Sequence, residues 1–377
     1  MNELIYRPWY FERPTLARKY LDLLLGGHGD PLALFAPRRV GKTSFLLHEL
    51  AGEAAGHGFA PVYIDVWQNR SDALSAINYA LQEALDDLSV PSSTTGRRLK
   101  TAVKKVGIAG ASLELGEEPA RRRPAEPALL IDWLLKSLVR EARKPVFLMF
   151  DEVQELAQVR GGEFVVAALR SAITKSRNSI RVIFTGSSQE QLLELFSRSR
   201  AALYEGASLV RFPLLDRQFI EFVASRVKQR YRTTVSVKEL EAAFEKLHFQ
   251  PRALLDLTFV YCASDHKSLA SILNEQWEAL LEGSDFDRLW KALKPLQQKI
   301  CRRIALGQEY SSQAARLEYA GGKDRMAPEM SPGTVSSTIK QLQKAHLIAR
   351  ASSGRGTYLL EDPLFAEWIR RTKSRDA

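Results

Sequence analysis

Nine consecutive residues decide the fold of this chain: Ala36, Pro37, Arg38, Arg39, Val40, Gly41, Lys42, Thr43 and Ser44. They match the phosphate-loop pattern GxxxxGK[ST], except that alanine, which is small enough for a turn, replaces the first glycine. An apolar run at 31–36 precedes the loop, and a helical pattern of apolar residues follows it as far as Gly56. This order of strand, loop and helix predicts an α/β fold with a phosphate site at the loop.

The chemistry of the loop predicts ATP and Mg²⁺ as its ligands. Backbone amides surround the β-phosphate, and Gly41 lets the backbone approach it closely. Lys42 is predicted to reach the β- and γ-phosphate oxygens, and the Thr43 hydroxyl to coordinate the magnesium ion. Arg38 and Arg39 lie within reach of the phosphates, although we expect them to face solvent or a neighbouring subunit.

A buried strand is predicted by the run PVFLMFDE at 145–152. The run does not alternate between apolar and polar residues, which is typical of a parallel strand covered on both faces. Asp151 would then lie at the carboxyl edge of the sheet and position Mg²⁺. Glu152 is predicted to polarise the water that attacks the γ-phosphate. The alternative for both carboxylates is an acidic helix start or a turn.

Hydroxyl side chains follow the next apolar run, IRVIFTGS at 180–187. Thr185, Ser187 and Ser188 are expected at the same edge of the sheet as Asp151. One of these hydroxyls is predicted to sense the γ-phosphate or to orient the attacking water. The alternative is that Ser188 caps the following helix, and one serine can serve each purpose.

Length and composition indicate an ordinary globular protein of two or three domains, with 377 residues of which 45% are hydrophobic. Residues 1–215 form the predicted core. Its basic insertion at about 91–127 is either a solvated linker or a loop that contacts phosphates. Residues 216–285 have an entirely helical pattern, and residues 286–377 form a third unit. Two cysteines without metal-binding spacing and the absence of an apolar signal or membrane segment lead us to expect a cytoplasmic protein.

The C-terminal unit is basic, with 17 Lys and Arg against 9 Asp and Glu, so it carries eight of the ten net positive charges. Helices predicted at 286–306, 309–320 and 332–345, followed by a hairpin, have the order of a winged helix. The polar face of the third helix consists of Thr334, Ser337, Thr338, Lys340, Gln341 and Lys344. This helix is predicted to enter the major groove of DNA, with Arg355 of the hairpin against the backbone or minor groove. The alternative is a module for protein docking or internal packing.

The sequence resembles the archaeal-type AAA ATPases, relatives of the origin-recognition ATPases and of the signal-transducing STAND NTPases. The resemblance rests on the order and spacing of five segments: APRRVGKTSFLL, MFDEVQEL, VIFTGSSQEQLLELF, LVRFPLL and YLLEDPLFAEWIRR. It covers residues 5–285 as the ATPase and 286–374 as an appended domain. The resemblance implies a P-loop NTPase fold of the AAA+ (ASCE) type, with a parallel sheet of order 5-1-4-3-2, a helical lid and a C-terminal winged helix.

The resemblance also implies roles that the patterns alone do not assign. Arg198 and Arg200 lie where such families carry an arginine finger that acts on a neighbouring subunit's ATP. Arg252 matches a lid arginine that contacts the nucleotide, although Phe and Gln at 249–250 stand where the family has glycines. The alternatives are surface charge for the first two arginines and an ordinary helix-start residue for the third. Residues 7–13 match a stretch that lies near adenine.

Together these features predict an ATP-binding and ATP-hydrolysing enzyme that couples its nucleotide state to DNA or nucleoprotein binding. The alternative is a STAND-like switch, in which the nucleotide state gates contacts with a protein partner or within a homo-oligomer, in regulation or in host defence. Both hypotheses share the phosphate site and differ in the partner.

Overall fold

The chain divides into two compact units, Glu12–Pro213 and a second unit that joins the N-terminal residues up to Phe11 to Leu214–Ala377. The structure is a computed structural model. It describes residues 7–26, 30–69, 72–89, 123–157, 162–187, 192, 195–196, 207–264, 268–282, 285–321, 329–345, 347–350 and 357–373. Within these ranges no helix has both the length and the apolar character needed to cross a membrane.

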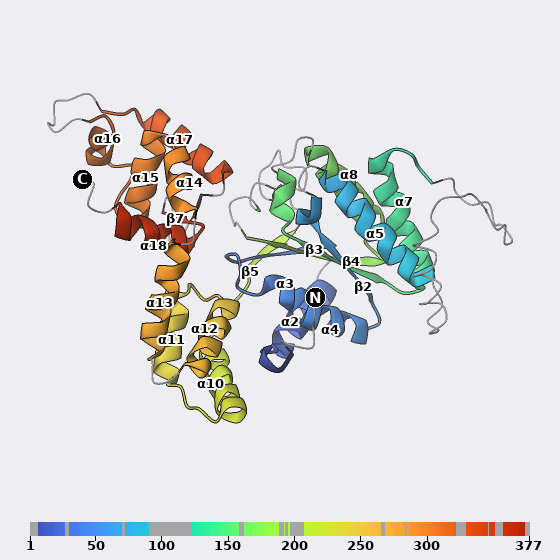
Figure 1. Cartoon of the computed structure of the whole chain (residues 1–377). Coiled ribbons are helices and arrows are strands. Elements are labelled where there is room, and N and C mark those ends of the chain that lie inside the picture. The colour runs from blue at the N-terminus through green and yellow to red at the C-terminus, as the bar shows by residue number, and fades with distance from the viewer. Residues whose placement is uncertain are drawn as a thin grey trace, which may run out of the picture. The chain divides into compact units, whose positions relative to one another are not determined.

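A parallel sheet of five strands forms the centre of the unit Glu12–Pro213 (Figure 1). The strands are β1 (Leu32–Phe35), β2 (Ala60–Asp65), β3 (Val146–Asp151), β4 (Ile180–Gly186) and β5 (Ser208–Arg211). Their order across the sheet is β5-β1-β4-β3-β2, which confirms the order that the resemblance implies. Because β1 ends at the phosphate loop, and β3 and β4 end in predicted site residues, this order brings all three strand ends to one edge.

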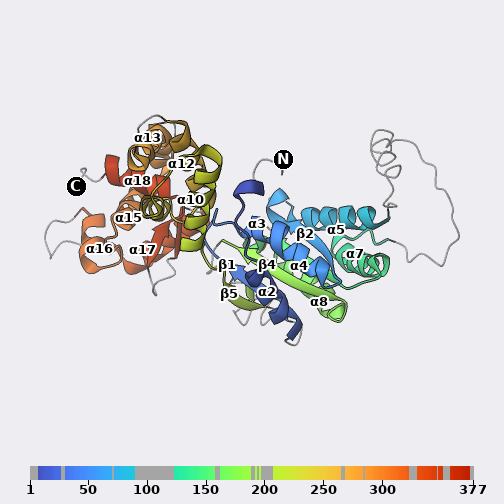
Figure 2. The ribbon, with the colours of Figure 1, turned by 90° about the horizontal axis from the view of Figure 1, so that it is seen from below.

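Helices cover both faces of this sheet. The helices on one face are α5 (Ala73–Ser89), α7 (Pro127–Ala142) and α8 (Gly162–Lys175), which share a hydrophobic core with the strands. Those on the other face, which is turned towards the viewer in Figure 2, are α2 (Pro14–Gly26), α3 (Lys42–Phe45) and α4 (Ala51–Gly56). All residues of β3 are buried, as its unbroken apolar run predicts.

The helix that follows the phosphate loop is interrupted by a wider turn. Between α3 and α4 the residues Leu46–Leu50 form a π-helical turn. The sequence pattern predicts a helix as far as Gly56, and the structure adds that the middle of this helix is a π-helical turn. Turns of this type are rare and frequently lie at functional sites. The turn contains Glu49, a buried carboxylate.

The second unit begins with four helices. They are α10 (Arg217–Tyr231), α11 (Val237–Lys246), α12 (Pro251–Ala263) and α13 (Leu269–Glu282). The Asp216 side chain caps α10, and the Ser236 side chain caps α11. The short 3-10 helix η1 (Arg7–Trp9) adds an aromatic ring to the core of these helices, since Trp9 packs edge-on against Phe259 with 5.0 Å between ring centroids.

The C-terminal elements enclose a core of their own. They are α14 (Phe286–Ala292), α15 (Pro295–Ala305), α16 (Gln313–Tyr319), α17 (Pro332–Lys344), β6 (Ile348–Arg350), β7 (Tyr358–Leu360) and α18 (Pro363–Thr372). β6 and β7 form the antiparallel hairpin that the sequence predicts. The Ser331 side chain caps α17, as expected from its position before Pro332.

Two sequence predictions in this region are wrong. The single helix expected at 286–306 is two helices, because Pro295 disfavours the helical conformation of the residue before it and starts a new helix. Thr338, assigned to the polar face of α17, is buried, and its hydroxyl donates to the Thr334 carbonyl oxygen at 2.9 Å. An intrahelical bond of this kind satisfies a threonine hydroxyl on the apolar side of a helix.

Candidate active site

The phosphate loop connects β1 to α3 in a tight turn. Arg39 and Gly41 have positive φ angles of 64° and 93°, a backbone conformation that glycine adopts without strain. Lys42 is 4% exposed, and its ammonium donates to the carbonyl oxygens of Ala36 at 2.9 Å and Pro37 at 3.0 Å. Burial lowers the pKa of Lys42, and the nearby carboxylates of Glu152 and Asp151 offset this only in part.

Asp151 lies at the end of β3 and accepts hydrogen bonds on both carboxylate oxygens. Thr43 Oγ1 donates to its Oδ2 at 2.5 Å, and the Tyr63 hydroxyl donates to the same atom at 3.0 Å. Thr185 Oγ1 and the backbone amide of Glu152 donate to Oδ1. The structure therefore brings Thr43, Asp151 and Thr185 together, as the strand order predicts.

The paired oxygens of Thr43 and Asp151 are the ligand type that Mg²⁺ prefers. Carboxylates and hydroxyls are hard donors, and Mg²⁺ in nucleotide sites takes only one or two protein ligands besides phosphate and water. Within the described residues no cluster of three or more His, Cys, Asp or Glu side chains forms a metal site made of protein alone. The residues present thus fit a magnesium ion held jointly with a nucleotide.

Glu152 occupies the position between the loop lysine and the end of β4. Its Oε1 lies 3.9 Å from Lys42 Nζ. Its Oε2 accepts from Ser187 Oγ at 2.9 Å and from Gln154 Nε2 at 2.5 Å. Glu152 also has a positive φ of 53°, which turns its side chain away from the direction of the strand. The carboxylate is thus within reach of both the phosphate loop and the hydroxyl at the end of β4.

Arg38 differs from its expected position. Its Nε donates to Ser187 Oγ at 3.2 Å, and its Nη2 lies 3.4 Å from Glu155 Oε1. The guanidinium is therefore bound by Glu155 and Ser187 near the carboxyl ends of β3 and β4 and does not simply face solvent. Glu155 is buried and supplies the negative charge for this contact. Arg39 is exposed, as expected.

Comparison with known proteins assigns the fold and the family. The family described as an ATPase domain predominantly from Archaea matches residues 10–257. The chain belongs to this ATPase family. The Walker-type ATPase of Pyrococcus abyssi is similar in structure, with a TM-score of 0.63, 21% identity and 97% of each chain covered. The Aeropyrum pernix ORC2 protein in its ADP form is similar with a TM-score of 0.55, 15% identity and 98% of each chain covered. No curated protein matches the sequence.

The structure of this ATPase adds three site residues that the sequence patterns do not indicate. They are Tyr63 on β2, and Gln154 and Glu155 in the 3-10 helix η4 (Val153–Ala157). A signal for Tyr63 exists in the register of the sheet, since Asp65 at the end of β2 lies opposite Asp151. Gln154 and Glu155 stand within the segment DEVQEL, next to the predicted acidic pair.

Arg13 of the ATPase contacts the helix behind the phosphate loop. Its guanidinium lies over the rings of Phe45 at 5.1 Å and Phe212 at 4.8 Å. Its Nε lies 3.5 Å from Glu49 Oε1, and both side chains are largely buried. The resemblance places residues 7–13 near adenine, whereas this arginine side chain is bound by a carboxylate of the π-helical turn.

The remaining predicted residues belong to the second unit or lie outside the described residues. Arg252 is exposed in α12 of the second unit, where its Nε donates to Asp256 at 2.9 Å. Ser188, Arg198, Arg200 and Arg355 lie outside the described residues, as does most of the basic insertion, 90–122. Their predicted roles remain predictions.

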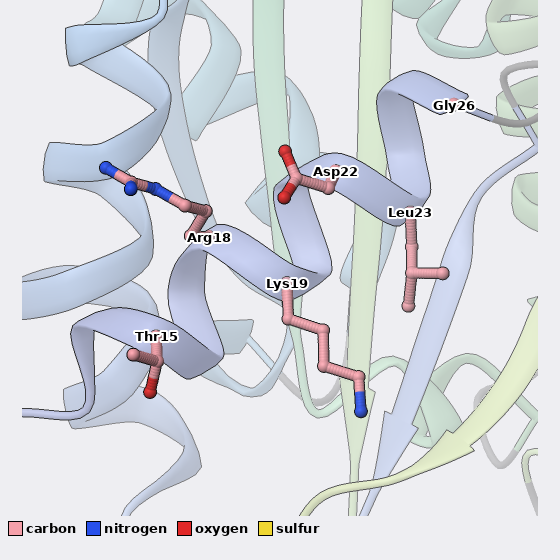
Figure 3. Close-up of a pocket in the computed structure, with 6 residues that line it drawn as sticks. All are labelled: Thr15, Arg18, Lys19, Asp22, Leu23 and Gly26. Carbon is pink, nitrogen blue, oxygen red and sulfur yellow. The ribbon is translucent and has the colours of Figure 1, made fainter.

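A surface hollow of the ATPase lies on α2, and none of the predicted site residues lines it (Figure 3). Its lining residues are Thr15, Arg18, Lys19, Asp22, Leu23 and Gly26. All of them belong to one helix, and Arg18 pairs with Glu53 at 3.2 Å. A hollow lined by one helix does not surround a ligand, so the nucleotide site is assigned to the loop and strand ends.

Proposed function

We propose that Lys42 and the loop amides of this ATPase hold the phosphates of ATP, that Thr43 and Asp151 hold Mg²⁺, and that Glu152 polarises the attacking water. The observation that carries the proposal is the convergence of loop, lysine, hydroxyl and two carboxylates at one edge of a parallel sheet. The structurally similar Aeropyrum pernix ORC2 protein has been solved with ADPNP and ADP, which fits the same ligand class.

Positioning and charge supply most of the catalysis in phosphoryl transfer. Magnesium, when bound, neutralises charge that develops on the phosphate oxygens. The Lys42 ammonium donates to two carbonyl oxygens of its own loop, so a triphosphate has to attract it away from them. Glu152 Oε1 lies on the lysine side of the site, where a water beside the γ-phosphate is within its reach. Ser187 is then placed to orient the same water or the same carboxylate.

For the C-terminal elements we propose a winged helix that binds DNA and whose affinity depends on the bound nucleotide. The last three helices before the β6–β7 hairpin, α15, α16 and α17, occur with it in the appropriate order. Lys340 and Lys344 are exposed on α17, together with Thr334, Ser337 and Gln341. The excess of basic over acidic residues in this region favours a polyanionic partner.

DNA affinity measured over a range of salt concentrations tests this proposal. Lys340→Ala and Lys344→Ala should each reduce the slope of log affinity against log salt by about 1, because each removes one phosphate contact. Lys228→Ala, an exposed lysine on α10, is the matched control and should leave the slope unchanged. Equal slopes for all four proteins would contradict DNA binding by α17.

ATP hydrolysis with and without DNA, combined with particle size in a slowly hydrolysed ATP analogue, tests the coupling. DNA-stimulated turnover or nucleotide-dependent DNA affinity is the expected result. No DNA affinity together with a nucleotide-dependent change in oligomer size would favour the STAND-like switch. If the turnover rate per subunit does not depend on protein concentration, Arg198 and Arg200 do not act as arginine fingers on the ATP of a neighbouring subunit.

A further inference from the structure

Gln154 is a residue of the site to which the proposed function gives no task. It follows β3 in η4, and its side chain is 0% exposed. A buried amide costs free energy unless hydrogen bonds replace those it made to water. The partners of this amide therefore indicate what holds it there.

The Gln154 amide nitrogen is directed at the carboxylate of Glu152. Nε2 donates to Glu152 Oε2 at 2.5 Å, and it also lies 3.1 Å from Ser187 Oγ and 3.5 Å from Glu155 Oε1. Ser187 Oγ donates to the same Oε2 at 2.9 Å. Two donors thus hold one oxygen of the carboxylate, and the other oxygen, Oε1, is left facing Lys42 at 3.9 Å.

The orientation of this amide is determined by the carboxylate. The opposite atom, Gln154 Oε1, is buried and has no hydrogen-bond partner in the described structure. Turning the amide over would bring that oxygen against Glu152 Oε2, and two acceptors in contact repel each other. A hydrogen bond to a charged group is worth more than one to a neutral group, so the observed orientation is favoured.

Gly186 at the end of β4 leaves room for this arrangement. A Cβ atom at this position would lie 2.6 Å from Gln154 Oε1 and 2.9 Å from the Leu192 side chain. Because Gln154 is fully buried, its side chain can relieve this clash only by shifting within the site. Even an alanine at 186 would therefore displace the amide from Glu152.

We propose that Gln154 is a positioning residue for ATP hydrolysis, which together with Ser187 holds Oε2 of Glu152 so that Oε1 is presented to the attacking water. The proposal rests on the proposed role of Glu152 as the group that polarises this water. It does not require Gln154 to touch the nucleotide. Removing the amide should therefore slow hydrolysis and leave ATP binding intact.

The test compares Gln154→Leu with Asn78→Leu in the full chain. Asn78 is a matched control, because it is also a buried amide, donating to the Pro127 carbonyl at 3.1 Å on the helical side of the same unit. Gln154→Leu should lower kcat by about tenfold to a hundredfold, the loss of one hydrogen bond to a charged group, with the Kd for ATP unchanged. Asn78→Leu should leave kcat at the wild-type value. An unchanged kcat in Gln154→Leu would overturn the proposal.

A double-mutant cycle with Glu152→Gln separates positioning from general structural damage. Once the carboxylate is gone, Gln154→Leu should cause no further loss in single-turnover rate. If Gln154→Leu lowered the rate of Glu152→Gln by the same factor as it lowers the wild-type rate, the proposal would be overturned. Gly186→Ala is the second variant, for use if Gln154→Leu does not fold, and it should lower kcat with the Kd for ATP unchanged. Wild-type kcat in folded Gly186→Ala would also overturn it.

If Glu152→Gln itself hydrolyses ATP at the wild-type rate, the proposed function fails. If it is slow while Gln154→Leu is normal, only the role of Gln154 fails.

Discussion

Lys42→Met keeps the buried stem of the side chain and removes the ammonium, so it isolates the contribution of that charge to ATP binding. Without nucleotide the ammonium makes two hydrogen bonds to neutral loop carbonyl oxygens, at about 3 kcal/mol together because only the donor is charged. Two bonds to phosphate oxygens would replace them at up to about 6 kcal/mol together, because both partners are then charged. The net loss in the variant is up to about 3 kcal/mol, a rise in the Kd for ATP of up to roughly a hundredfold. Isothermal titration with ATP and Mg²⁺ measures this directly. An affinity within about twofold of wild type would refute the assignment of the lysine to the phosphates.

The same variant makes a prediction about stability without nucleotide. Burial lowers the pKa of Lys42, so the folded protein binds this proton less tightly than the unfolded chain does. The cost of burying the charge is fully present below the folded pKa and disappears as the pH rises towards the ordinary value of 10.5. Met carries no charge, so Lys42→Met should be more stable than wild type near neutral pH. The difference should shrink in alkaline solution. Urea unfolding across this pH range checks the sign, and a less stable variant at neutral pH would contradict it.

Three further substitutions test the surroundings of the site. Arg13→Met leaves the buried Glu49 carboxylate without its cation and should lower the free energy of unfolding by about 3 kcal/mol, measured with urea; a loss below about 1 kcal/mol would show the pair to be unimportant. Gly41→Ala forces an L side chain to a φ of 93° and should cost about 1–2 kcal/mol of stability, and an equally stable variant would contradict the strained turn. Thr185→Val removes a hydrogen bond to Asp151, the proposed magnesium ligand, and should raise the Mg²⁺ concentration for half-maximal turnover about tenfold. The control is Thr258→Val, which changes a buried threonine of α12. An equal Mg²⁺ requirement in the two variants would count against a role of Thr185 in holding Asp151.

The parts of the site that could be predicted depend on topology. Thr43 and Asp151 lie far apart in the sequence, but each is fixed at the carboxyl end of a parallel strand or at the loop that follows one. In a parallel sheet these ends meet at one edge, whatever the details of side-chain packing. The loop, the acidic pair, Thr185 and Ser187 could therefore be expected at one edge of the sheet from their spacing alone.

The parts that could not be predicted depend on register and side-chain direction. Tyr63 reaches Asp151 because Asp65 of β2 is opposite Asp151, and a sequence does not specify how neighbouring strands align. The direction of the Glu152 side chain depends on the positive φ angle of its backbone, and a glutamate in the sequence does not predict such an angle. We expect Arg38 in solvent from the sequence because a long arginine side chain on a loop can adopt many orientations. The sequence does not show that the η4 residue Glu155 is buried close enough to bind it.

Single-turnover hydrolysis of bound ATP by Glu152→Gln, with its ATP affinity measured in parallel, tests most directly whether this edge of the sheet is the catalytic centre. The variant should bind ATP and Mg²⁺ with an affinity close to that of wild type, because the loop, Lys42 and Asp151 are unchanged. Its hydrolysis rate should fall by at least about a hundredfold, within the range for loss of a group that acts on the attacking water. Hydrolysis at the wild-type rate would contradict the account.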